Sequence, residues 1–195
     1  MVSVVSLGLT SIAQTSPGVG TRPGAALPPE KSGVAVAQRL AAETIAEDST
    51  DAPWTRVYID DAFTGDAARR ALRGAAERLA QPNCQLVFSE FSDGRGQPLS
   101  NRLVELGASP QGYLRLVVFL DAGPSPQCGK PGVLAFTSRN SRVVYLCGRD
   151  FERAERRDPR EMQVTIIHEL LHSLGLGENP PSPREISFRI LRRCA

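Results

Sequence analysis

One stretch of the chain carries two stripes of residues at helical spacing, one apolar and one polar. The apolar stripe recurs every three or four positions, as the buried side of a helix does, and consists of Val164, Ile167, Leu171 and Leu174. The polar stripe has the same spacing and consists of Thr165, His168, Glu169 and His172. Asp158 before Pro159 is a typical helix start, and Gly175 is a typical stop. The pattern predicts a helix over 159–174 with one buried and one polar side.

The residues upstream predict a sheet with a helix behind it. Residues 66–79 have an alanine-rich side and an arginine-rich side, which predicts an amphipathic helix. The run 113–120 is the most apolar of the predicted strands and is expected in the centre of the sheet. After Pro180 and Pro181, Ser182 followed by Pro183 predicts a short last helix. Apolar runs between turn residues predict about five strands, at 56–59, 86–91, 113–120, 133–137 and 143–147.

These elements predict an α+β domain over 55–195, a mixed twisted sheet with a backing helix and the 159–174 helix. Residues 1–13 form a short apolar run that ends in small residues, a candidate signal peptide without a basic start. Residues 14–33 are rich in Pro, Gly and Ser, as flexible linkers are. Residues 34–54 begin with an alanine-rich helical pattern, and we expect an N-terminal helix or a pro-segment.

The composition excludes several kinds of partner. The chain has 195 residues, of which 41% are hydrophobic, and a formal net charge of +2, which fits one globular domain with tails. Its arginines are spread along the chain without a basic stripe of interleaved aromatics, so we expect no nucleic-acid partner. No apolar run is long enough to span a membrane. We expect a monomer.

The cysteines suggest an oxidising compartment. There are four, with no CxxC pair, which in an exported chain indicates two disulfides. Among the possible pairings we predict Cys128–Cys147, across a predicted hairpin region, and Cys84–Cys194, which ties the last helix to the sheet. Together with the apolar run at 1–13, these bridges predict a secreted or periplasmic protein.

The polar stripe contains the pattern His168-Glu169-x-x-His172. Residues four apart on a helix lie on one side and one turn apart, so both imidazoles can bind one metal ion. Glu169 lies beside them, close enough to take a proton from a water molecule on that metal. These are the only two histidines in the chain, so a further protein ligand must be Asp, Glu, Cys or Tyr.

The run HELLHSLGLGE, residues 168–178, resembles the HExxHxxGxxH signature of the metzincins, a group of zincin metallopeptidases. Gly175 stands at the glycine position, and Glu178 stands where the third histidine would be. The resemblance implies Zn²⁺ bound by His168, His172 and Glu178. The chain departs from the family in this carboxylate ligand and in having no methionine after the motif, where the family has its Met-turn. Glu185 and Cys147 are the alternative third ligands.

The resemblance covers residues 56–178 and implies a zincin-like fold with a very small C-terminal subdomain. It also implies zinc-dependent endopeptidase activity on a peptide or protein substrate, with Glu169 as general base. The strand at 133–137 would be the edge that pairs with the substrate. Tyr145 and Arg184 are candidates for stabilising the oxyanion of the transition state. The alternatives are a zinc hydrolase of a non-peptide amide and a non-catalytic zinc-binding interaction domain.

Overall fold

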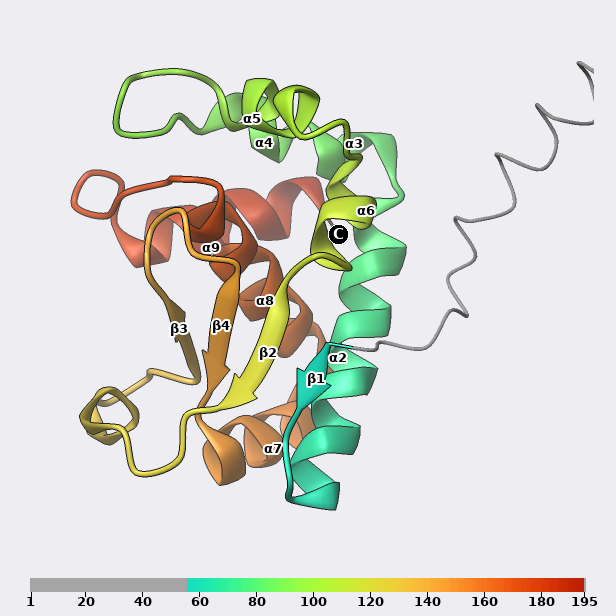
Figure 1. Ribbon diagram of the computed structural model, residues 1–195, viewed down its shortest axis with the longest axis vertical. Coiled ribbons are helices and arrows are strands. Elements are labelled where there is room, and N and C mark those ends of the chain that lie inside the picture. Colours follow the sequence, from blue (N-terminus) through green and yellow to red (C-terminus); the bar gives the residue numbers. More distant parts are fainter. Residues whose placement is uncertain (1–55, 195) are drawn as a thin grey trace, which may run out of the picture. The chain divides into compact units, whose positions relative to one another are not determined.

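The computed structural model describes residues 56–194 (Figure 1). The segments predicted at 1–13, 14–33 and 34–54 lie outside the described residues. The described part combines short strands with helices, which confirms the α+β class. In chain order the elements are β1 (Val57–Tyr58), α2 (Ala62–Leu79), α3 (Pro82–Gln85), α4 (Val87–Glu90), α5 (Leu99–Glu105), α6 (Pro110–Leu114), β2 (Val118–Asp121), the 3₁₀ helix η1 (Pro126–Gly129), β3 (Ala135–Thr137), β4 (Val143–Leu146), α7 (Gly148–Arg157), α8 (Pro159–Ser173) and α9 (Pro183–Arg193).

The sheet is mixed, as predicted, but within residues 56–194 it has four strands and not five, in the order β1-β2-β4-β3. β1, β2 and β4 are parallel, and β3 is antiparallel to β4. The predicted hairpin is present, with Asn140 in its turn at a φ of 63°. β2 lies inside the sheet, as expected for the most apolar run, and β3 forms one edge.

The strand predicted at 86–91 is wrong, because residues 87–90 form α4 directly after the short helix α3. Leu86 is 45% exposed, whereas a strand alternation would bury it together with Phe88. Short apolar runs fit both a strand and a helix, and packing against the core selects the helix here. The buried residues are spaced three or four positions apart: Cys84, Val87, Phe88 and Phe91.

The strand predicted at 113–120 is only partly correct. Its first residues belong to α6, and β2 begins at Val118. The Ser109 hydroxyl accepts a hydrogen bond from the Gly112 N–H at 3.0 Å, and Pro110 follows it as the first helical residue. This helix-start signal outweighs the apolar character of the residues that follow. The pattern also does not predict the helices α5 and α7.

Helices α2 and α8 lie behind the sheet (Figure 1). α2 begins at Ala62 and not at Asp66, because the Asp61 carboxylate accepts a hydrogen bond from the Thr64 N–H at 2.8 Å and caps the helix. Its buried side consists mostly of alanine and glycine, which allows α8 and α7 to pack closely on it. At Gly74 a Cβ would collide with the Gln163 side chain of α8. Small residues of α2 therefore set the position of α8.

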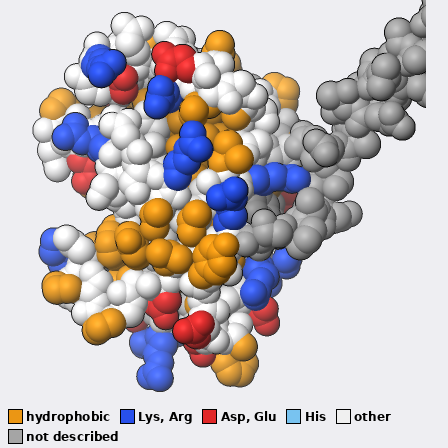
Figure 2. Space-filling view, in the orientation of Figure 1, with side chains coloured by type: hydrophobic (Ala, Val, Ile, Leu, Met, Phe, Trp, Pro, Cys, Tyr) orange, Lys and Arg blue, Asp and Glu red, His pale blue; other side chains and the backbone are white. Residues whose placement is uncertain are grey.

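The opposite face of the sheet, toward the viewer in Figure 1, is apolar (Figure 2). One row of cross-strand neighbours on this face consists of Tyr58, Leu120, Tyr145 and Phe136. The rings of Phe136 and Tyr145 stack with their centroids 5.2 Å apart. Tyr145 is therefore part of the sheet surface.

Both predicted disulfides are present, Cys84–Cys194 and Cys128–Cys147. The first joins the helix α3 to the end of α9, so it does not tie the last helix to the sheet as predicted. A disulfide stabilises a fold by restricting the unfolded chain, and this one closes a span of 110 residues. The bridges are compatible with an exported protein. Within residues 56–194, no helix combines the length and the apolar character that crossing a membrane requires.

Candidate metal centre

Helix α8 forms as the sequence predicts. The Asp158 carboxylate accepts hydrogen bonds from the backbone N–H groups of Arg160 at 3.0 Å and Glu161 at 3.1 Å, which caps the helix. The helix ends at Ser173, and its core side buries the predicted apolar stripe.

The opposite side of α8 carries three buried polar side chains. His168 is 8% exposed, and Glu169 and His172 are each 7% exposed. Polar groups buried to this degree destabilise the fold unless each has a partner. The hydrogen-bond and ion-pair partners of these three side chains therefore indicate their role.

The chain reverses direction after α8 at Gly175, whose φ is 118°. Glycine adopts this region of backbone conformation far more readily than other residues, and a Cβ at this position would lie 2.9 Å from Asn140 Oδ1. The Asn140 backbone N–H donates to the His172 carbonyl at 3.2 Å, which ties the β3–β4 turn to the end of α8. The predicted stop is confirmed, and it directs the next residues back toward the histidines.

This reversal brings Glu178 to the two histidines. Its Oε1 lies 3.1 Å from His172 Nε2 and 3.6 Å from His168 Nε2. The ligand atoms of the three residues all lie within 4.8 Å of one another. His168, His172 and Glu178 therefore form a group that could hold a metal ion.

The two alternative third ligands are engaged elsewhere. Cys147 forms a disulfide with Cys128, so it has no thiolate to offer. Glu185 binds Arg189 one turn further along α9 and does not line the cleft beside the histidines. Glu178 is therefore the carboxylate that the described structure brings to them.

Each histidine is held through its second ring nitrogen. His172 Nδ1 donates to the Leu176 carbonyl at 2.9 Å, and His168 Nδ1 lies 3.0 Å from Ser187 Oγ. A carbonyl oxygen can only accept, so His172 carries its proton on Nδ1 and presents a lone pair at Nε2. Metal-binding histidines are oriented by hydrogen bonds of this kind.

The space between the ligand atoms fits a cation. His172 Nε2 is buried and has no hydrogen-bond partner among the described residues, although a Glu178 oxygen lies 3.1 Å away. A lone pair facing a carboxylate oxygen repels it unless a positive charge lies between them. In a tetrahedral site with metal–ligand bonds of about 2.0–2.2 Å, ligand atoms lie about 3.3–3.6 Å apart. The distance of 3.6 Å agrees with that spacing, and the distance of 3.1 Å lies slightly below it.

Glu169 lies beside this group without belonging to it. Burial raises the pKa of its carboxyl group to about 8; the Glu178 carboxylate adds to the rise, and the Thr137 backbone N–H opposes it. Without a metal ion, Glu169 is therefore mostly protonated at neutral pH, whereas a nearby cation would favour the carboxylate. A pKa close to neutrality suits a group that exchanges protons during a reaction.

His168 is shifted in the opposite sense. Burial lowers the pKa of its imidazole to about 4; repulsion from His172 adds to the effect, and Glu178 opposes it. The ring is therefore neutral throughout the neutral pH range. Because metal binding requires a neutral imidazole, His168 can bind without first losing a proton.

The group of three candidate metal ligands opens into a cleft of about 1330 Å³. Helix α8 contributes the floor, residues 132–139 with the edge strand β3 contribute one wall, and α9 contributes another. Tyr145 and Arg184, the candidates for stabilising the oxyanion, are not among the described residues that line this cleft.

Sequence reasoning missed Ser187, which holds His168 from α9. The signal in the sequence is faint: a small hydroxyl residue next to Ile186 in an amphipathic helix. No local pattern links Ser187 to a histidine 19 positions earlier.

We compared the chain with known proteins and found that no protein-family model, no curated protein and no solved structure matches it. The site must therefore be interpreted from its own chemistry.

Proposed function

We propose that this chain is a zinc peptidase of the zincin class, similar to the metzincins, that hydrolyses internal peptide bonds. The observation that carries the proposal is Glu169, a buried carboxyl group at the floor of an open cleft, beside three candidate metal ligands. No cationic side chain among residues 56–194 pairs with it. A non-catalytic metal site has no use for such a group, whereas a metal-dependent hydrolase needs a base there.

A zinc ion bound by His168, His172 and Glu178 would supply a Lewis acid that polarises the substrate carbonyl and makes water more acidic. Glu169 accepts a proton from the attacking water and returns it to the leaving amine. Hydrogen bonds to both Nδ1 atoms keep the imidazoles in place while charge moves through the site.

The edge strand β3 supports a peptide as the substrate. One side of an edge strand has backbone N–H and C=O groups without strand partners, and an extended peptide can pair with them. Because residues 132–139 line the cleft beside the metal ligands, a peptide held there would pass the site in extended form. The two disulfides support a place of action outside the cytoplasm.

The test is hydrolysis of casein, an unstructured protein, by the purified full chain, with zinc per chain measured by elemental analysis. We expect stoichiometric zinc and activity that a chelator removes and added zinc restores. Glu169→Gln should keep the zinc and lose the activity. A zinc-loaded wild-type chain that cleaves neither casein nor short peptides would overturn the peptidase proposal, and hydrolysis of acylated amines would then favour the amide hydrolase.

A further inference from the structure

The basic side chains of the cleft form no ion pair with any acidic side chain that the structure describes. Four of them line it, Lys130, Arg139, Arg160 and Arg192, and within residues 56–194 none makes an ion pair. Two acidic residues of the same cleft lie away from the metal ligands, Asp158 and Glu161, and the first is engaged in capping α8. The basic residues therefore outnumber the acidic ones outside the metal group.

Arg192 differs from the arginines on either side of it in α9. Arg189 binds Glu185, and Arg193 binds Glu90. Arg192 instead lies over the ring of Phe188, with 5.9 Å from the guanidinium carbon to the ring centroid. A cation–π contact holds a guanidinium in place but does not neutralise its charge. Arg192 thus presents a held positive charge to the cleft.

Arg160 lies at the same end of the cleft as Arg192. The Arg78 guanidinium donates hydrogen bonds to the Cys194 carbonyl and to Gln163 Oε1. Burial lowers the pKa of Arg78, and the charge of Arg160 adds to this effect. The end of α9 and the first half of α8 therefore meet around Arg78. The contact between His168 and Ser187 marks the other end of this wall, next to the metal ligands.

The distance from the metal group to this basic end can be estimated from helix geometry. A helix rises about 1.5 Å per residue, so Arg192 lies roughly 7.5 Å along α9 from Ser187, and Arg160 roughly 12 Å along α8 from His168. An extended peptide rises about 3.3 Å per residue, so these distances correspond to about two to four substrate residues. Between them the wall is apolar, because Phe188 is 57% exposed and Leu191 is 38% exposed in the cleft.

We propose that Arg192, together with Arg160, forms a carboxylate-binding subsite, and that the substrates are peptides with an acidic group about two to four residues from the cleaved bond. This inference rests on the proposed peptidase function. The carboxylate could belong to an Asp or Glu side chain or to the C-terminus of the substrate, since both offer the same bidentate acceptor to a guanidinium. An apolar residue of the substrate lies against Phe188 and Leu191.

The experiment compares peptides that differ at one position. The first set consists of fluorogenic peptides with a blocked C-terminus. Each peptide carries Glu, Gln or Lys at one position, which lies two, three or four residues from the cleaved bond on either side of it. A second set carries Gln and a free C-terminus at those distances. We expect kcat/KM to be about tenfold higher for Glu than for Lys at one position in low salt, with a smaller ratio as salt screens the charges.

Variants of the full chain assign the preference. Arg192→Gln should lower the ratio of Glu to Lys cleavage, and Arg192→Glu should lower it further, because the positive charge of Arg160 remains in the cleft. Arg184→Glu is the matched control, because it makes the same charge change on α9 outside the cleft, and it should behave like wild type. A thermal melt of each variant checks that it folds.

The outcomes separate this inference from the proposed function. Equal cleavage of the Glu and Lys peptides with no preference for a free C-terminus, or a Glu preference that Arg192→Glu leaves unchanged, would overturn the subsite and leave the peptidase intact. Better cleavage of the free C-terminus set would support the subsite with the chain end as its carboxylate. If no peptide is cleaved, the proposed function fails, and fluorescence anisotropy of the labelled Glu and Lys peptides decides the subsite, which equal affinities would overturn.

Discussion

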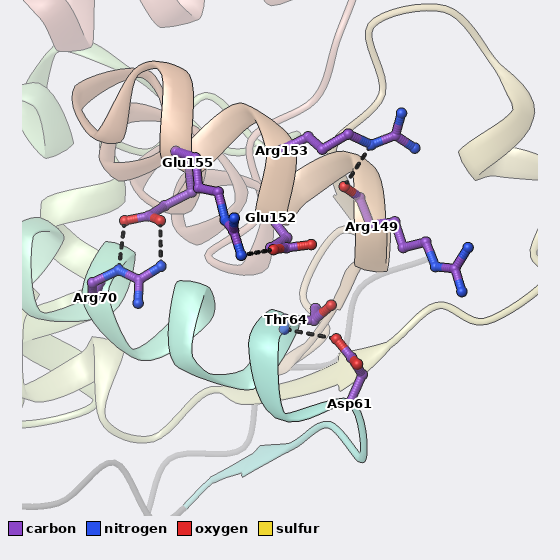
Figure 3. A network of polar contacts seen from close by, with 8 residues as sticks. Asp61, Thr64, Arg70, Arg149, Glu152, Arg153 and Glu155 are labelled. Carbon is purple, nitrogen blue, oxygen red and sulfur yellow. Dashed lines mark hydrogen bonds and ion pairs between the residues drawn. The ribbon is translucent and has the colours of Figure 1, made fainter.

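Two glutamates of the described chain are almost equally buried and are treated in opposite ways. Glu155 in α7 is 4% exposed, and Glu169 in α8 is 7% exposed. Arg70 of α2 donates to both carboxylate oxygens of Glu155, from Nε at 3.1 Å and from Nη2 at 2.6 Å (Figure 3). Glu169 has the Thr137 backbone N–H as a hydrogen-bond partner, and the charge that acts on it is the like charge of Glu178.

The difference distinguishes a buried carboxylate that stabilises the fold through an ion pair from a buried carboxyl group that has no ion pair. A buried charge is costly unless it is paired, and a bidentate guanidinium is among the best available partners. Glu155 has such a partner in the Arg70 guanidinium. Glu169 has none among the described residues, and its carboxyl group instead takes up a proton. Buried groups with strongly shifted pKa values concentrate at functional sites, and the position of Glu169 next to the metal ligands fits that rule.

The same substitution at both positions tests this contrast most strongly. Glu169→Gln should lower hydrolytic activity by about 10²–10⁴-fold, the range that general acid–base groups contribute, and should not reduce stability. Glu155→Gln should retain activity per folded molecule, because α7 contributes no residue to the cleft. Casein hydrolysis normalised to bound zinc measures both. Equal losses of activity would erase the distinction between the two residues.

Removing the Glu178 carboxylate should weaken metal binding. Glu178→Ala should weaken zinc binding by more than the roughly 10–100-fold typical for loss of a partner that only orients a ligand. Glu185→Ala is the matched control, since that residue is tied to Arg189, and it should leave zinc affinity unchanged. Competition with a chromogenic chelator gives both affinities. Loss of zinc in the Glu185 variant instead would reassign the third ligand.

The candidate site was predictable where its determinants are local. The cap at Asp158, the two stripes of α8 and the stop at Gly175 lie within one short segment, and all three agree with the structure. The resemblance added Glu178, which depends on the reversal just after the helix. The candidate metal ligands therefore come from eleven consecutive residues, 168–178.

The rest depends on contacts between distant residues. Arg70 and Glu155 are 85 positions apart, and no spacing rule pairs them. The strand predicted at 86–91 failed because a short apolar run carries too few residues to distinguish a strand from a helix. The raised pKa of Glu169 arises from how deeply α8 is covered, which only the packed structure determines.

The stability of Glu155→Gln should show what the paired glutamate contributes. We expect the free energy of unfolding to fall by about 1–3 kcal/mol, less than for a fully buried pair because the Arg70 side chain is 46% exposed. Urea denaturation with zinc removed measures it. Adding Arg70→Met should recover part of the loss, since the guanidinium then no longer lacks its partner. No loss in the single variant would mean that the pair is not stabilising.

The pH dependence of stability gives the finest contrast. In the metal-free protein, Glu169 has a pKa of about 8 where the ordinary value is 4.5. The folded state therefore holds a proton that the unfolded chain has lost between these values, and stability falls as pH rises through the window. His168, with a pKa of about 4 where the ordinary value is 6.5, acts in the opposite direction from about pH 4 to 6.5. The two effects nearly cancel between about pH 4.5 and 6.5, where both operate. What remains is a fall in stability between about pH 6.5 and 8.

With a chelator present, wild type should lose up to about 2 kcal/mol of unfolding free energy across that remaining window, since one proton is worth about 1.4 kcal/mol per pH unit. Urea titrations at successive pH values measure it. Glu155→Gln should show the same fall from a lower starting value, because Glu169 is untouched. Glu169→Gln should show no fall, and saturating zinc should remove it from wild type by favouring the carboxylate. If the fall in the free energy of unfolding persists in Glu169→Gln, another group carries the proton, and the proposed difference between the two glutamates is wrong.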